Sequence, residues 1–174
     1  MKRYAQLAAW IYDPLEYECP MGQLVYLNKK RNLALVKENR KLYVVCRGTS
    51  LRDDPVGDVF SDVALFLGNI EYTPRFMELD NFIQPYLKQK QNLVLIGHSL
   101  GGTLATELGL KYTIESQTFN SGKSPMQRRT FWRKRHPRSR EYRNSFDLVS
   151  LLGAFDRHTV TIKQNASHSI YTFT

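Results

Sequence analysis

The chain has 174 residues, of which 25 are Lys or Arg and 16 are Asp or Glu, giving a formal charge of 25 − 16 = +9. Apolar residues make up 42% and aromatic residues 12%, which excludes a disordered polycation. The length predicts one domain of ordinary size that buries roughly 70% of the surface exposed by the unfolded chain. The two cysteines, Cys19 and Cys46, are too few for a disulfide framework and suit a reducing compartment.

Nearly all of the positive charge lies in residues 122–143. This segment has nine basic residues and one acidic residue, for 9 − 1 = +8, whereas the rest of the chain has 16 basic and 15 acidic residues, for +1. We therefore predict a nearly neutral domain with a basic insertion at about 122–143, and the total charge alone does not indicate a nucleic-acid-binding protein. The basic residues are Lys123, Arg128, Arg129, Arg133, Lys134, Arg135, Arg138, Arg140 and Arg143.

No stretch of the sequence approaches the 18 or so apolar residues of a bilayer span. The first 12 residues superficially resemble a short signal peptide, but Gln6 interrupts the apolar run and no clear small-residue cleavage site follows it. Apolar side chains recur here at helical spacing, with Pro14 just beyond them, and this pattern predicts a packed N-terminal helix. We accordingly favour a cytoplasmic location.

Three short strands are expected at 23–27, 33–37 and 42–46, with polar turns between them, and this spacing suggests a meander. Apolar residues then recur at helical spacing over 76–87. This pattern predicts a helix that Pro85 should kink or distort in its later turns.

The second half of the chain alternates between strand and helix patterns. The continuous apolar run at 93–96 is typical of a strand covered on both faces of a sheet. Leucines at four-residue spacing follow it and predict a helix, and further strands are expected at 116–119, 146–149 and 159–162. The alternation predicts an α/β fold with a central, mostly parallel sheet and flanking helices.

The junction between the strand at 93–96 and its helix reads Gly97-His98-Ser99-Leu100-Gly101. A glycine two residues before the serine and another two residues after it match a nucleophile elbow. At so tight a turn the flanking positions tolerate little more than a hydrogen atom. The helix N-terminus directs N–H groups at the oxygen on which charge develops during acyl transfer. A glycine-rich turn that merely contains a serine is the alternative.

A nucleophilic serine needs a base within hydrogen-bond reach. His98 is adjacent to Ser99 and is expected to point away from it into structural hydrogen bonds, and His136 lies in the basic segment. His158 and His168 both follow the elbow, as the chain order Ser, Asp, His requires. We favour His168, because it lies in a loop beyond the last strand, whereas His158 opens that strand.

The base in turn needs a carboxylate that fixes its tautomer. Asp147 and Asp156 are the only acidic residues between the basic segment and His168. We favour Asp147, because Asp156 lies in a turn beside Arg157, a potential ion-pair partner. No cluster of His, Cys and carboxylate residues has metal-ligand spacing, so we expect neither a metal nor a cofactor.

Several short motifs follow one another over about residues 42–171. They are Val44-Val45-Cys46-Arg47-Gly48-Thr49, Gly97-His98-Ser99-Leu100-Gly101-Gly102, Thr118-Phe119-Asn120-Ser121-Gly122, Arg143-Asn144 shortly before Asp147-Leu148-Val149, and His168 with Tyr171. In this order they resemble the class 3, or fungal-type, lipase family of α/β-hydrolases.

The resemblance implies a serine carboxylester hydrolase, a lipase or esterase, acting on an ester or lipid substrate. It implies a triad in which Ser99 is the nucleophile, His168 the base and Asp147 the acid. It also implies an oxyanion hole formed by the backbone N–H of Leu100 and by the backbone N–H and hydroxyl of Thr49.

Asp62 is similar to the family aspartate that braces the oxyanion residue, so the resemblance makes it a partner of Thr49. The chain departs from the family pattern at Asn120, where a glycine is usual, and at Ser150-Leu151, where a proline is common. The segment 50–57 leaves room for only a small lid, which argues against interfacial activation controlled by a lid.

The basic segment mixes cations with Phe131 and Trp132 and has three interpretations. The favoured one is a solvated insertion whose aromatic residues pack on the domain. A contact with an anionic lipid or phospholipid surface comes next, and nucleic-acid binding is the least favoured. The alternative function is a hydrolase-fold protein without turnover that binds an anionic membrane or nucleic acid through this segment. That alternative gains if neither His168 nor His158 lies near Ser99.

Overall fold

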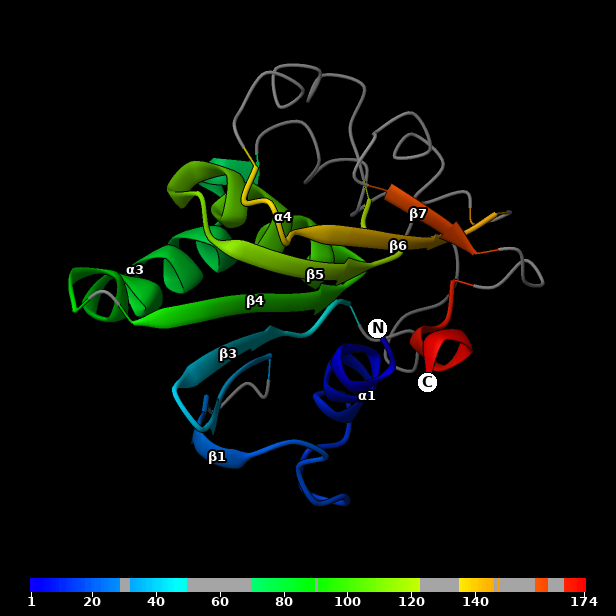
Figure 1. Cartoon of the computed structure of the whole chain (residues 1–174), viewed down its shortest axis with the longest axis horizontal. Coiled ribbons are helices and arrows are strands. Elements are labelled where there is room, and N and C mark those ends of the chain that lie inside the picture. The colour runs from blue at the N-terminus through cyan, green and yellow to red at the C-terminus, as the bar shows by residue number, and fades with distance from the viewer. Residues whose placement is uncertain are drawn as a thin grey trace.

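The computed structural model describes residues 1–28, 32–49, 70–89, 91–122, 135–145, 147, 159–162 and 168–174. Its centre is a seven-stranded sheet in which the strands lie side by side in chain order (Figure 1). The strands are β1 (Gln23–Leu27), β2 (Leu33–Glu38), β3 (Lys41–Cys46), β4 (Asn92–His98), β5 (Glu115–Phe119), β6 (Arg140–Asn144) and β7 (Thr159–Ile162).

The first three strands form the predicted antiparallel meander, and every pair from β3 to β7 is parallel. The helices within the described residues are α1 (Lys2–Trp10), α3 (Pro74–Lys88) and α4 (Leu100–Tyr112), with short 3-10 helices η1 (Ile70–Tyr72) and η4 (Ile170–Phe173). A mostly parallel sheet with flanking helices confirms the predicted α/β fold class. Within the described ranges, no helix is both long enough and apolar enough to cross a membrane.

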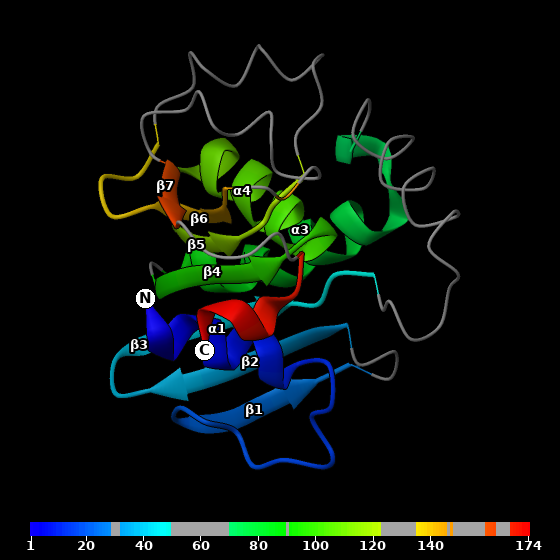
Figure 2. The same cartoon turned by 90° about the vertical axis from the view of Figure 1, so that its right-hand side faces the viewer.

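The sheet is covered on both faces, because successive side chains of its central strands point to opposite sides. In β3, Tyr43 and Val45 belong to the core that contains α1 and η4, whereas Val44 and Cys46 belong to the core that contains α3 and α4. Figure 2 shows α1 and η4 lying together, so that the two ends of the chain meet beside the sheet.

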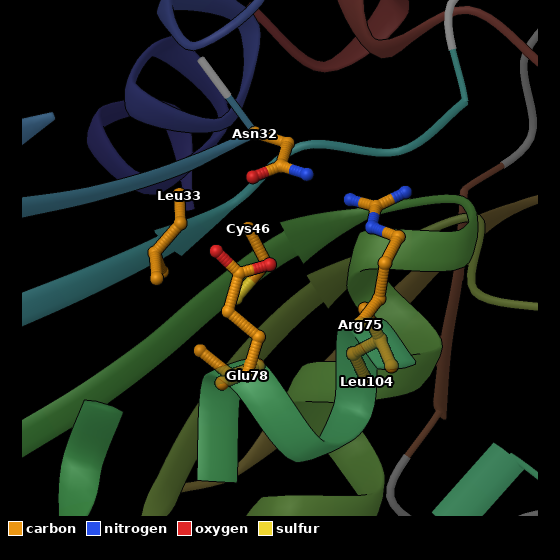
Figure 3. Close-up of a pocket in the computed structure, with 7 residues that line it drawn as sticks. Asn32, Leu33, Cys46, Arg75, Glu78 and Leu104 are labelled. Atoms are coloured by element: carbon orange, nitrogen blue, oxygen red, sulfur yellow. The ribbon is translucent and has the colours of Figure 1, made fainter. Parts of the chain in front are cut away.

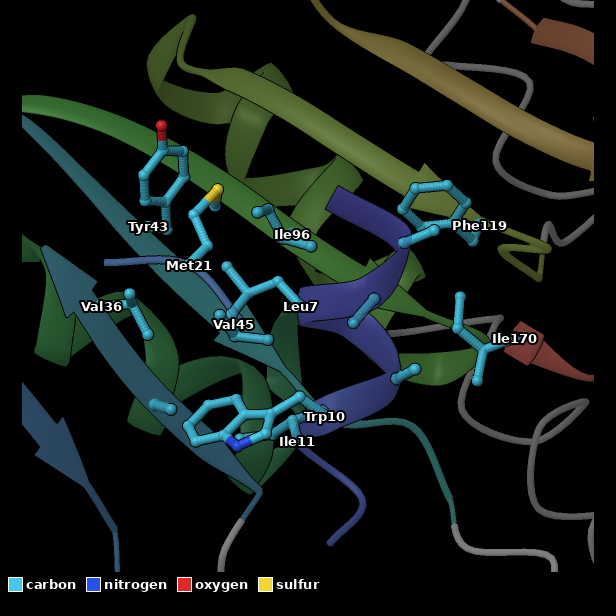
Figure 4. Packing of buried hydrophobic residues seen from close by; sticks show 14 of the residues in the cluster. Leu7, Trp10, Ile11, Met21, Val36, Tyr43, Val45, Ile96, Phe119 and Ile170 are labelled. Carbon is cyan, nitrogen blue, oxygen red and sulfur yellow. The ribbon is translucent and has the colours of Figure 1, made fainter. Parts of the chain in front are cut away.

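The N-terminal helix packs as predicted. Leu7, Trp10 and Ile11 lie against the sheet residues Val45 and Ile96 (Figure 4). Leu7 and Ile11 are fully buried. Burial of a large aliphatic side chain contributes roughly 1.5–3 kcal/mol, so this contact anchors the first residues of the chain on the sheet.

Helix α3 begins at Pro74 with Thr73 as its N-cap, whose side chain accepts a hydrogen bond from the Phe76 N–H at 3.3 Å. Proline suits the first helical turn, because the N–H that it lacks would have no helical partner there. Pro85 lies inside the helix, which nevertheless continues to Lys88.

The strand predicted at 146–149 is wrong in its position. Asp147 is described and lies outside any strand, the other residues of 146–149 lie outside the described part, and the strand next to β5 is β6 (Arg140–Asn144). Its charged residues Glu141 and Arg143 are 0% and 3% exposed, so the apolar pattern that marks an interior strand is missing. The end of the basic segment therefore belongs to the central sheet, while residues 123–134 lie outside the described part.

Candidate active site

The turn between β4 and α4 holds Ser99 in an unusual backbone conformation, with φ 54° and ψ −127°. A non-glycine residue held there costs on the order of 1–3 kcal/mol and persists only where neighbouring contacts fix it. Here the Ser99 N–H donates to the Phe119 carbonyl at 3.0 Å, and the Ser99 carbonyl accepts from the Thr103 N–H at 3.0 Å. The turn thus joins β4, β5 and α4 and holds the serine at the carboxyl edge of the sheet.

Both glycines that flank the serine are required by close backbone contacts. A Cβ atom on Gly97 would lie 2.3 Å from the carbonyl oxygen of Gly101, and one on Gly101 would lie 2.2 Å from that of Cys46. These separations are far below a van der Waals contact. The glycine spacing around Ser99 therefore follows from the tight approach of β3, β4 and α4.

Ser99, His168 and Asp147 lie in one hydrogen-bonded row. His168 Nε2 is 2.8 Å from Ser99 Oγ, and His168 Nδ1 is 2.9 Å from Asp147 Oδ1. The side chain of Asp147 is 2% exposed and that of His168 is 20% exposed, so the carboxylate is buried and the imidazole borders solvent. A carboxylate at Nδ1 fixes the imidazole with Nε2 free to accept the serine proton.

Two elements bring the later residues of this row to the elbow. Asp147 follows β6, and its N–H donates to the Asn144 carbonyl at 3.2 Å. His168 precedes η4, whose Ile170 and Phe173 are buried in the core beneath α1. Packing of the C-terminal 3-10 helix therefore positions the histidine over the serine.

The segment that follows β3 approaches the elbow from the other side. Cys46 lies opposite Gly97 in the parallel β3–β4 pair, so the chain continues from there past the serine. A Cβ on Gly48 would lie 2.6 Å from the His98 carbonyl oxygen and 3.1 Å from Ser99 Cβ. Thr49 is the next residue, and it ends the described part of this segment.

Leu100 is the first residue of α4, so its N–H is among the four at a helix start that have no partner inside the helix. The helix dipole places partial positive charge at the same point. Leu100 at the start of α4 and Gly48 on the segment after β3 therefore both border Ser99. Asp62, Asp156 and His158 lie outside the described residues.

Arg75 holds the segment after β3 from the side of α3. Its guanidinium donates to the Arg47 carbonyl, while the Arg47 N–H donates to the Asn32 carbonyl at 2.9 Å. Figure 3 shows Arg75 reaching from α3 toward this segment, beside a pocket that Cys46 and Glu78 also line. At about 10 Å³ that pocket has room for a single water molecule at most, so it is not a substrate site.

His98 makes structural hydrogen bonds away from Ser99, as expected from the sequence. Its Nδ1 is 2.8 Å from the Tyr12 hydroxyl and its Nε2 is 2.7 Å from the His168 carbonyl oxygen. Burial first, and the neighbouring His168 second, lower the pKa of His98 to about 3, against the opposing effects of the hydrogen bond to the His168 carbonyl and of Asp147. The imidazole of His98 is therefore neutral at pH 7. His136, by contrast, is half-buried and accepts from the Arg138 N–H at 3.3 Å.

Because His98 is buried, the free energy of unfolding should decrease at acidic pH. The unfolded imidazole takes up a proton near pH 6.5, but the folded one does so only near pH 3. The unfolded state thus binds more protons between these values, and the free energy of unfolding should fall as the pH drops from about 6.5, with a slope of up to about 1.4 kcal/mol per pH unit.

Urea unfolding of the wild type and of His98→Gln at several pH values between 4 and 7 measures this contribution. The variant should show a flatter dependence, with one fewer proton taken up on unfolding. Both proteins retain Tyr12, His168 and Asp147, so the difference between their slopes isolates His98. Equal slopes would show that His98 is not held neutral by its surroundings.

Comparisons with known proteins identify the class of fold. No protein-family model matches the sequence, and no curated protein matches it. Solved structures of fungal lipases do match. A propeptide complex of Rhizomucor miehei lipase is 15% identical over 99% of this chain and 75% of that one, with a TM-score of 0.50. A lipase from Rhizopus microsporus var. chinensis is 15% identical over 95% of this chain and 74% of that one, with a TM-score of 0.51. Lipase II from Rhizopus niveus is 14% identical over 95% of this chain and 80% of that one, with a TM-score of 0.54.

At this level of identity the similarity establishes the fold, which is the α/β-hydrolase-like fold of these fungal lipases. Within the described residues, no group of three or more His, Cys, Asp and Glu side chains could hold a metal ion.

Tyr12 contacts His98 in the elbow, although nothing in the sequence marked it as a site residue. It lies 86 residues from His98 in the chain. Only its place at the end of an amphipathic helix is visible in the sequence, and that pattern predicts core packing.

Proposed function

We propose that this protein is a serine hydrolase of carboxylic esters, a lipase or esterase, with Ser99 as nucleophile, His168 as general base and Asp147 as the acid that orients it. The observation that carries the proposal is the row of hydrogen bonds of 2.8 and 2.9 Å from the Ser99 hydroxyl through His168 to Asp147. The row starts on a strand-to-helix turn with the strained serine and close-packed glycines of a nucleophile elbow. Similarity to fungal lipases in fold supports the proposal further.

The reaction proceeds in two halves. Ser99 Oγ attacks the ester carbonyl carbon while His168 Nε2 takes the serine proton, and the carbonyl oxygen becomes an oxyanion. The N–H of Leu100 and the N–H and hydroxyl of Thr49 stabilise that oxyanion, which is worth about 10²–10³ in rate for one donor. His168 then protonates the leaving alcohol, and the acyl group stays on Ser99.

Water completes the second half. His168 takes a proton from the water, the resulting hydroxide attacks the acyl carbon, and the carboxylic acid leaves as His168 returns the proton to Ser99. Throughout, the buried carboxylate of Asp147 stabilises the imidazolium form of His168 through the 2.9 Å contact. Asp62, outside the described residues, is proposed to brace Thr49.

The proposed substrates are lipid esters, phospholipids included, because the fold neighbours are lipases and the basic segment would attract an anionic surface. The alternative, a binding module without turnover, predicts a histidine displaced from the serine. The 2.8 Å distance from His168 to Ser99 argues against it.

A series of p-nitrophenyl esters with acyl chains of two to twelve carbons tests the function. The wild type should turn over the series, with a preference for the longer chains if it is a lipase. Ser99→Ala should lose the activity. Ser121→Ala is a matched control, because Ser121, like Ser99, is a buried serine, and it contacts the elbow helix at Gly102. Equal rates for Ser99→Ala and the wild type would overturn the proposal.

A further inference from the structure

Tyr12 brings the N-terminal helix into contact with the elbow. It lies two residues beyond Trp10, the last residue of α1, and its N–H donates to the Ala9 carbonyl at 3.1 Å. Its phenol oxygen is 2.8 Å from His98 Nδ1, and the two rings meet edge to face at 66°. His98 is 4% exposed, so this contact takes place in the interior beneath the proposed nucleophile.

The direction of each hydrogen bond around His98 follows from the chemistry of its partners. The His168 carbonyl oxygen can only accept, so His98 Nε2 carries the hydrogen and donates to it at 2.7 Å. A neutral imidazole with its proton on Nε2 has a lone pair on Nδ1. The Tyr12 O–H therefore donates to Nδ1.

The phenol oxygen of Tyr12 also contacts the segment that leads to Thr49. The hydroxyl packs closely against Gly48, because a Cβ on Gly48 would lie only 2.8 Å from it. The guanidinium of Arg47 stands over the Tyr12 ring, 5.3 Å from its centroid. One hydroxyl thus packs against the segment that leads to Thr49 and donates to the elbow histidine.

We propose that Tyr12 and His98 are positioning residues that tie the backbone of the general base His168 to the segment carrying the oxyanion residue Thr49. The inference rests on the proposed function, whose reaction needs both groups placed around one substrate carbonyl. The path runs from Gly48, against which the Tyr12 hydroxyl packs, through the hydrogen bond from Tyr12 to His98 and on to the His168 carbonyl. A misplacement of about 1 Å in such a site can cost about 100-fold in rate.

The neutrality of His98 suits this role. The rings of His98 and His168 lie 5.0 Å apart between centroids. When His168 takes the serine proton and becomes positive, a second positive ring at that distance would oppose the transfer. Burial keeps the pKa of His98 low. The hydrogen bond from the Tyr12 hydroxyl uses the lone pair of His98 Nδ1, which is the atom that a second proton would have to bind.

Tyr12→Phe removes the hydroxyl and keeps the ring that packs at the end of α1. We expect kcat to fall by about 10- to 100-fold with KM nearly unchanged, because positioning of the reacting groups is lost and substrate contacts are kept. Tyr4→Phe, the same substitution on α1, is the matched control and should leave kcat unchanged. Tyr4 packs on Tyr43, in the core on the α1 side.

Two substitutions at His98 separate positioning from simple packing. His98→Gln keeps an N–H near the position of Nε2 that can donate to the His168 carbonyl, whereas His98→Leu fills similar space without a donor. The glutamine variant should retain at least ten-fold more esterase activity than the leucine variant. Equal activity of the two variants at equal folded fraction would overturn the role of the hydrogen bond.

A measurement on the wild type is independent of turnover. Two-bond ¹H–¹⁵N correlation spectra at pH 7 should report His98 as the neutral Nε2–H tautomer, and Ser99→Ala should give the same result. An Nδ1–H tautomer or a charged ring would overturn the bond directions.

The rate at which a fluorophosphonate probe labels Ser99 distinguishes a failure of the positioning role from a failure of the proposed function. An unchanged rate in Tyr12→Phe, with the wild type labelled, overturns the positioning role and leaves the proposed function standing. A wild type that is never labelled overturns the proposed function, and the positioning role with it.

Discussion

Replacing His168 with alanine is expected to lower kcat for ester hydrolysis by about 10⁶-fold, to nearly the level of Ser99→Ala. The physical reason is the 2.8 Å contact between His168 Nε2 and Ser99 Oγ, through which the proton must leave for the oxygen to attack. Without the imidazole the hydroxyl stays protonated at neutral pH and the alcohol has no acid to protonate it.

The double variant, Ser99→Ala with His168→Ala, should be no slower than either single variant, because the two residues act as one unit. Asp147→Asn should lose less, about 10⁴-fold, since it leaves the serine and imidazole in place and disturbs only the tautomer. Steady-state rates at saturating p-nitrophenyl ester measure all four. Losses of Ser99→Ala and His168→Ala that multiply in the double variant would contradict a shared mechanism.

Gly101→Ala should destabilise the fold by about 3 kcal/mol or more, a large share of the stability of a domain of this size. The added Cβ would lie 2.2 Å from the carbonyl oxygen of Cys46, 2.7 Å from its carbon and 2.8 Å from the carbonyl carbon of Arg47. These are backbone atoms of β3 and of the segment after it, so they cannot rotate away as a side chain would. Helix α4 and strand β3 must separate.

Gly109→Ala is the matched control on the same helix. Its Cβ would lie 3.1 Å from the Ser116 side chain and 3.2 Å from the Ile114 carbonyl oxygen, which requires only a small adjustment. The gain in helix propensity, about 1 kcal/mol, offsets that adjustment. Urea unfolding should place Gly109→Ala within about 1 kcal/mol of the wild type. A similarly small change for Gly101→Ala would show that α4 and β3 are not locked together.

The parts of the fold that the sequence predicted are those with a local pattern. The helix at the N-terminus, the three-strand meander and the strand-to-helix elbow each have regular spacing of apolar residues or a glycine pattern fixed by sterics. Strand β6 has neither, because Glu141 and Arg143 occupy its buried positions. The strand was therefore predicted at 146–149, where most residues are apolar, and not at the position of β6.

The residues of the candidate site also differ in how far the local sequence could predict them. Ser99 could be predicted because the turn around it requires glycine at positions 97 and 101, and this requirement is visible in the local sequence. The choice of His168 and Asp147 depended on chain order and on their places relative to the neighbouring strand and turn, since no motif marks either residue. The contact between Tyr12 and His98 could not be predicted, because it joins residues 86 positions apart and is set by the packing of α1 beneath the elbow.

The role of Ser99 as the nucleophile is tested most directly by locating a covalent fluorophosphonate adduct in the intact, folded protein. Peptide mass spectrometry should find the phosphonyl group on Ser99, and labelling should slow by at least about 10³-fold in His168→Ala. An adduct on another residue, or equally fast labelling of His168→Ala, would contradict a serine activated by this histidine.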